Sequence, residues 1–177
     1  SVRVSRLVPS VLVAVLVLQL VPRAAQVRPD TLPCTFPPGE IAWLQRALDN
    51  WHLVSREFLF VDPSPLPWIV LFDASCVWHL SSDSTLIREA RSVETTLTFA
   101  GRPVPGRALR HAGTVLLPNG VPVPVEMKAS TALYRNSRGT FFVMAMPSVW
   151  QTKGVSAPTR AEYLQGVFSH EMTHTRL

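Results

Sequence analysis

The sequence predicts an α+β fold in which a mixed or antiparallel sheet accompanies an N-terminal helix and a C-terminal helix. Apolar residues recur at helical spacings of three and four in 39–58 and again from residue 160 onward. The stretch between them holds apolar runs of strand length, separated by prolines and glycines. The chain has 177 residues, 47% hydrophobic and 16% charged, which is enough for one domain with a buried core.

The first 25 residues predict export from the cytoplasm. Two arginines precede an apolar run over 7–21, an order that is typical of a signal peptide. The run is too short for a spanning helix, so we expect a signal peptide over 1–25 that is cleaved after Ala25. Arg23 lies where the cleavage site prefers a small residue, which leaves an uncleaved membrane anchor as the alternative. We therefore expect a secreted or periplasmic protein that touches a membrane only through such an anchor.

The charge distribution argues against a nucleic-acid partner. The net charge is +5, but without the three arginines of 1–25 the chain has 14 basic and 12 acidic side chains, a net charge of +2. The other arginines are scattered, and no stripe of base-stacking aromatics accompanies them. The sequence makes no prediction of the oligomeric state.

The two cysteines, Cys34 and Cys76, predict a disulfide, because an oxidising compartment favours one. It would close a loop of about 43 residues and stabilise the fold by up to ~4 kcal/mol in the chain-entropy model. The alternatives are one buried and one reactive thiol, or a metal ligand. Residues 26–38 are rich in proline and predict a linker, which leaves 39–177 as the domain.

The first helix is predicted over 39–58 and packs on the core through one face. Its apolar positions are Ile41, Leu44, Leu48 and Trp51. His52 lies beside this face, where we expect a half-buried packing residue.

Strands and turns are predicted between the two helices. In chain order they are a strand at 68–72, a short helix at 82–91, a strand at 94–100, a loop at 101–113, a hairpin of 114–117 and 121–127, and a strand at 140–146. The first strand is continuously apolar, as in strands buried on both faces, and the second alternates. Asn119-Gly120 supplies the positive φ angles of the hairpin turn. Pro122 and Pro124 cannot donate ladder hydrogen bonds, so the second hairpin strand should lie at a sheet edge or be irregular.

A second helix is predicted to begin near Arg160. Thr159 is its expected N-cap, and Glu162 follows three residues later to complete a capping box. An apolar stripe follows the helix and consists of Leu164, Val167, Phe168 and Met172. His170 and His174 lie four residues apart on an adjoining face.

These two histidines predict a zinc site, since imidazoles at i and i+4 can bind one ion at about 2.0–2.1 Å each. Glu171 is offset by one residue, and from there its carboxylate can act as general base toward a water that the ion activates. The alternative is an ordinary surface helix end whose histidines are favoured by the helix dipole.

The segment Val167-Phe-Ser-His-Glu-Met-Thr-His174 resembles the active-site helix of the zincin metallopeptidases. The resemblance implies zinc as cofactor, His170 and His174 as its ligands, Glu171 as general base, and hydrolysis of a peptide or protein substrate. It makes 39–177 a partial zincin-like domain. It also suggests 140–146 as the edge strand that pairs with extended substrate.

The sequence departs from the family after the motif. In the metzincin branch, two further residues lead to a Gly and then a third His, but Leu177 stands in place of that Gly. A gluzincin-like branch takes its third ligand, a Glu, from a later helix, so we expect the sequence to be a truncated record. The alternative is an upstream ligand, for which the available residues are Cys34, Cys76, His79, His111 and Glu126.

Two other functions remain open on the sequence. One is a non-enzymatic exported binding or envelope-associated module in which the histidines are incidental. The other is a zinc amidohydrolase that acts on a non-peptide or cell-wall amide. It would share the metal site and differ in the pocket.

Overall fold

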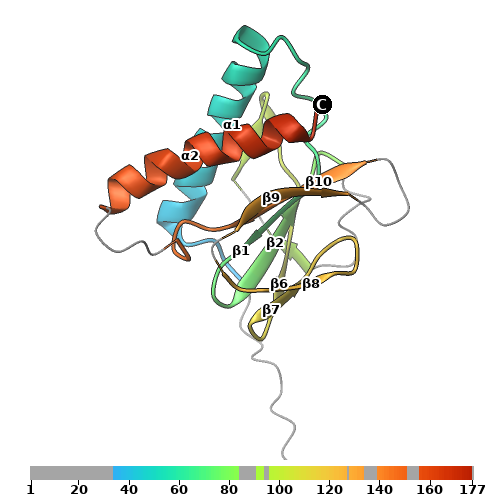
Figure 1. Cartoon of the computed structure of the whole chain (residues 1–177), viewed down its shortest axis with the longest axis vertical. Helices are drawn as coiled ribbons and strands as arrows, with labels where there is room; N and C mark the ends of the chain where they lie inside the picture. The colour runs from blue at the N-terminus through green and yellow to red at the C-terminus, as the bar shows by residue number, and fades with distance from the viewer. Residues whose placement is uncertain are drawn as a thin grey trace, which may run out of the picture. The chain divides into compact units, whose positions relative to one another are not determined.

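The computed structural model describes residues 34–83, 91–93, 96–126, 128–133, 139–150 and 156–176, which all belong to one unit of the chain (Figure 1). The predicted α+β fold is confirmed. Helices α1 (Pro38–Glu57) and α2 (Ala157–His174) accompany a six-stranded sheet. In spatial order its strands are β3 (Arg91–Val93), β6 (Gly106–Arg110), β2 (Cys76–Leu80), β1 (Ile69–Phe72), β10 (Thr140–Ala145) and β9 (Ala129–Leu133).

The sheet is mixed, because β1 and β10 run parallel while the other neighbouring strands within the sheet pair antiparallel. Successive strand residues point to opposite faces, and each face packs on a different partner. The two helices cover one face, and the hairpin of β7 (Thr114–Leu116) and β8 (Pro122–Pro124) covers the other (Figure 1). The central strands are therefore buried on both sides.

Helix α1 confirms the first predicted helix to within one residue at each end. Its buried face is wider than predicted, since Trp43 and Ala47 join the expected leucines and tryptophan. His52 is half-buried and its ring meets Phe99 edge to face, at 5.6 Å between centroids. The packing role expected for His52 is confirmed.

The structure also confirms three predicted β elements. All four residues of β1 are buried, β10 occupies the predicted strand at 140–146, and the β7–β8 hairpin forms around Asn119-Gly120. Gly120 has a φ of 78°, while Asn119 lacks the positive φ expected of it. Among the described strands, the proline-containing strand β8 pairs with β7 alone, which agrees with the predicted edge position.

Two other predictions need correction. The loop predicted at 101–113 is wrong, because it contains β5 (Arg102–Pro103) and β6, and β6 pairs with β2 inside the main sheet. The strand predicted at 94–100 is present only as β4 (Thr98–Phe99) in its described part. Of the helix predicted at 82–91, residues 84–90 lie outside the described residues. Strands β2 and β9 carry no clear alternation and were not predicted.

The predicted disulfide between Cys34 and Cys76 is confirmed, with 5.9 Å between the two Cα atoms. It joins the residues before α1 to the start of β2. Phe36 stacks on Trp78 of β2 beside it, at 4.6 Å between ring centroids. The described part of the predicted linker is therefore packed on the sheet. None of the described helices is long and apolar enough to cross a membrane.

Candidate metal centre

Helix α2 is fixed to the domain by the apolar stripe predicted for it. Leu164, Phe168 and Met172 are fully buried, and the Phe168 ring packs edge to face against Trp43 of α1 and Phe142 of β10. The Trp43 indole N–H also donates to the Ala161 carbonyl at 2.8 Å. The helix begins at Ala157, where the Arg160 amide donates to the Ser156 carbonyl, three residues before the predicted start.

The two histidines of the motif lie together on the exposed face of α2. The Nε2 atoms of His170 and His174 are 3.3 Å apart, and their rings meet edge to face at 4.9 Å. Two Zn–N bonds of about 2.0–2.1 Å at a tetrahedral angle would separate their nitrogens by about 3.3–3.4 Å. The pair therefore fits one zinc ion. Without metal, the same contact is a hydrogen bond between the rings.

Glu171 directly follows His170 in the chain and is held by Thr131 of β9. The Thr131 hydroxyl donates to the Glu171 main-chain carbonyl at 2.9 Å and also lies 3.4 Å from its carboxylate. The carbonyls of a last helical turn have no partner inside the helix. Because the Thr175 amide bonds to Met172 instead, the Glu171 carbonyl depends on Thr131. This contact links the expected general base to the sheet.

The end of α2 is fastened to the proline-rich segment that precedes β1. The Arg176 guanidinium donates to the carbonyls of Pro63, at 2.8 Å, and Pro65. Burial lowers the pKa of Arg176, and the nearby Asp62 carboxylate acts in the opposite direction. Arginine keeps its charge under such shifts. The last turn is thus anchored two residues after His174.

No upstream residue from the described ranges completes a three-ligand metal group with the two histidines. Cys34 and Cys76 form a disulfide with each other, so neither has a thiolate that could bind a metal ion. His79 is buried in β2 and its Nδ1 accepts from the Trp68 indole at 3.0 Å. His111 uses both ring nitrogens, one with the Asp73 carbonyl and one with the Gly113 amide.

The edge strand suggested by the family resemblance is also corrected. Strand β10, at 140–146, lies between β1 and β9 inside the sheet. The strand beside α2 with one described neighbour is β9. Sequence reasoning placed His170, Glu171 and His174 together but missed Thr131 and Arg176. No protein-family model, curated protein or solved structure matches this chain.

Proposed function

We propose that this protein is an exported zinc-dependent hydrolase and that its substrate is a peptide. The observation that carries the proposal is the 3.3 Å separation of the His170 and His174 Nε2 atoms, since it equals the spacing of two zinc ligands. A third ligand would come from outside the described residues. The arrangement supports a metal site, because the two ring nitrogens lie at the separation that one shared zinc ion would give them.

Each residue of the motif has its own task in the proposed reaction. His170 and His174 would hold the ion through Nε2. A bound zinc supplies Lewis acidity, which polarises a carbonyl and lowers the pKa of water. Glu171 takes the proton of the attacking water and passes it to the leaving amine. Thr131 holds the main chain of Glu171 in place through its hydrogen bond to the Glu171 carbonyl. The Glu171 carboxylate can then move the proton without a shift of the helix end.

A peptide is favoured as substrate by the position of β9. The strand lies against α2 and hydrogen-bonds to β10 on one side, while no described strand pairs with its other side. An extended peptide can add to such an edge through main-chain hydrogen bonds. The disulfide supports export, because such bonds persist in oxidising compartments.

The test compares zinc content and peptide hydrolysis in purified variants. We expect His170→Ala and His174→Ala to lose zinc, because each removes one of the paired nitrogens. Glu171→Gln should keep zinc and hydrolyse a quenched fluorescent peptide library at least ~100-fold more slowly, as expected for loss of a general base. Zinc is measured by elemental analysis after gel filtration.

Two matched variants serve as controls. Glu162→Gln makes the same chemical change on the exposed surface of α2, and His111→Gln removes a histidine that has partners elsewhere. Both should retain zinc and hydrolysis. Wild-type hydrolysis by Glu171→Gln would refute the mechanism, and retention of zinc by both His170→Ala and His174→Ala would refute the metal site.

A further inference from the structure

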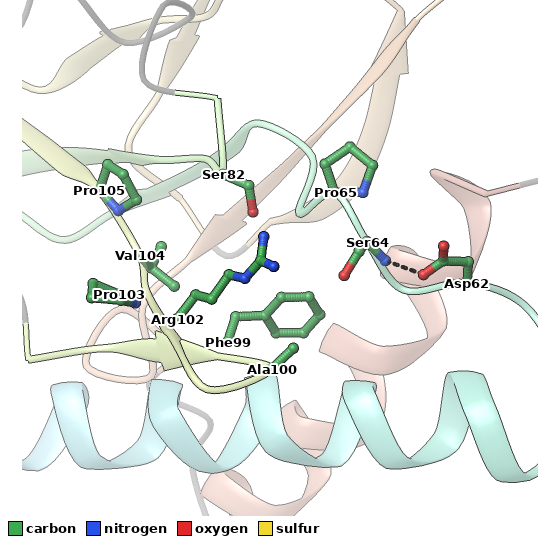
Figure 2. Close-up of a pocket in the computed structure, with 10 residues that line it drawn as sticks. All are labelled: Asp62, Ser64, Pro65, Ser82, Phe99, Ala100, Arg102, Pro103, Val104 and Pro105. Carbon is green, nitrogen blue, oxygen red and sulfur yellow. Dashed lines mark hydrogen bonds between the residues drawn. The ribbon is translucent and has the colours of Figure 1, made fainter.

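A cavity of about 590 Å³ lies apart from the motif residues, between the segment around Ser64 and the β4–β5 hairpin (Figure 2). None of His170, Glu171 and His174 lines it. Its walls are partly apolar, formed by prolines and the Phe99 ring, and partly polar. A volume of this size is within the range of small-molecule sites.

The β4–β5 hairpin places an aromatic ring and a cation side by side in this cavity. Its two-residue turn, Ala100-Gly101, has positive φ at both positions, 51° and 73°, as type I′ turns require. Phe99 and Arg102 are therefore directly paired across the hairpin and share one face. Figure 2 shows the ring and the guanidinium extending into the same space.

The turn adopts this geometry at an energetic cost. Ala100 is a non-glycine residue in the left-handed region, a conformation that costs about 1 kcal/mol or more. Such strain clusters at ligand sites, where the surroundings hold it in place. Here the Gln45 side chain holds the hairpin to α1, because it accepts from the Thr98 amide at 2.9 Å and donates to the Thr98 carbonyl at 3.0 Å.

The polar groups opposite the hairpin are fixed by their own contacts. The Ser82 hydroxyl accepts from the Leu66 amide at 3.0 Å, which leaves its proton to donate. The Ser64 amide donates to the Asp62 carboxylate at 2.9 Å, and the Ser64 hydroxyl faces the cavity in Figure 2. The main chain of Arg102 pairs with Phe99 in the hairpin, and its side chain forms no hydrogen bond or ion pair with any described residue. An anion would meet one guanidinium and two hydroxyls there.

The charge of the lining selects the class of anion. Among the described lining residues Arg102 is the one cation, and Asp62 at the other wall carries a negative charge. Asp62 repels a doubly charged phosphate more strongly than a singly charged carboxylate, and the planar fork of one arginine can hold a carboxylate by two hydrogen bonds. The prolines and Phe99 suit an apolar group attached to that carboxylate.

We propose that this cavity binds a carboxylate joined to an apolar group, with Arg102 as its anion partner and Phe99 as part of its apolar wall. Both a small organic acid and the C-terminal residue of a peptide have this chemistry. The proposal does not depend on the metal centre, because its residues and its ligand are separate from the motif.

The test titrates the full chain with N-acetyl-L-leucine and with N-acetyl-L-leucinamide, which lacks the charge, by isothermal titration calorimetry. We expect the acid to saturate and the amide to bind at least ~10-fold more weakly, because the amide leaves the guanidinium unpaired. Arg102→Gln should weaken binding of the acid by a similar factor. Arg46→Gln, on the exposed surface of α1, should change neither.

A longer probe separates the two sources of carboxylate. If the ligand is the end of a peptide, a pentapeptide with a C-terminal leucine carboxylate should bind at least ~10-fold more tightly than N-acetyl-L-leucine. If the ligand is a small acid, the two compounds should bind with equal affinity. The proposal is overturned if the acid shows no saturation up to about 10 mM, if the amide binds as tightly, or if Arg102→Gln binds like wild type with an unchanged melting temperature.

Discussion

Thr131 is the residue that joins the proposed general base to the sheet. Its hydroxyl is the partner of the Glu171 carbonyl, so Thr131→Val leaves a half-buried carbonyl without its hydrogen bond. We expect this variant to lose about 1 kcal/mol of unfolding free energy. Zinc content should stay unchanged while the turnover number falls, because Glu171 is displaced and the histidines are not.

Thr131→Ser is the matched control, since it keeps the hydroxyl and removes only a methyl group. It should restore most of the turnover number. If Thr131→Val and Thr131→Ser behave alike, Thr131 acts through packing, and the hydrogen bond has no role in positioning Glu171. Chemical denaturation and steady-state kinetics on the same preparations provide both readouts.

His79 should make the stability of the protein depend on pH. Burial lowers the pKa of His79 from 6.5 to about 4. Between these values the unfolded chain binds a proton that the folded chain does not, so stability falls as the pH falls. The loss from above pH 6.5 to below pH 4 is about 3 kcal/mol for this group.

Urea denaturation of wild type and His79→Gln at a series of pH values measures this effect. Glutamine can still accept from the Trp68 indole N–H, which His79 Nδ1 accepts in the folded protein. The variant should show a shallower loss of stability below pH 6.5. Parallel curves for the two proteins would show that His79 does not remain neutral in the fold.

At the scale of residues, the sequence was informative where chemistry follows from local spacing. A helix of 3.6 residues per turn brings His170 and His174 together wherever that helix lies. Thr131 could not be found in this way, because it meets Glu171 only through the pairing of β9 with the rest of the sheet. Arg176 likewise has partners more than a hundred residues away.

At the scale of elements, α2 is held along its length by buried side chains and at its end by Arg176. Arg176→Ala removes the hydrogen bonds from its charged side chain to Pro63 and Pro65. We expect a loss of about 1–3 kcal/mol in unfolding free energy and weaker zinc binding, since the turn that carries His174 frays. Competition with a chromogenic chelator measures the zinc affinity.

Arg176→Lys separates charge from geometry. Lysine keeps the positive charge near Asp62 but has no planar fork for two carbonyls. It should recover only part of the lost stability and zinc affinity. Full recovery would mean that charge near Asp62 suffices, and equal zinc affinity in Arg176→Ala would show that the last turn needs no anchor.

Several strands could not be recognised from their own residues. In β2 all five residues are buried, including His79, so no polar alternation marks it. In β9, all residues except the exposed Leu133 are half-buried and have small or polar side chains. Such residues are found both in an outer strand covered by a helix and in a loop, so the sequence alone did not identify β9 as a strand. For β6, the flanking glycines and arginines predicted a loop, and pairing with β2 outweighed that local preference.

At the scale of the whole molecule, the fold class followed from the sequence and the packing of its layers did not. Amphipathic helices at both ends and apolar strands between them are local patterns. That the helices share one face while the β7–β8 hairpin covers the other depends on strand order. Strand order is set by contacts between distant residues, such as the parallel pairing of β1 with β10.

The disulfide is expected to contribute to the stability of this arrangement as a whole. Replacement of Cys34 and Cys76 by serine frees the chain before α1 from β2. We expect the free energy of unfolding to fall by about 2–4 kcal/mol, measured as a lower urea midpoint. The reduced wild-type protein should match the double variant, and a midpoint equal to that of the oxidised protein would contradict this role.

One short segment of backbone, 62–65, contacts both the Arg176 side chain at the end of α2 and the cavity described above. Arg176 donates to the carbonyls of Pro63 and Pro65, and Asp62, Ser64 and Pro65 line the cavity that contains Arg102. A ligand that shifts this stretch would act on the helix end that carries His174. Thermodynamic linkage then fixes the return effect: whatever factor such a ligand imposes on metal affinity, the metal imposes on the affinity for that ligand.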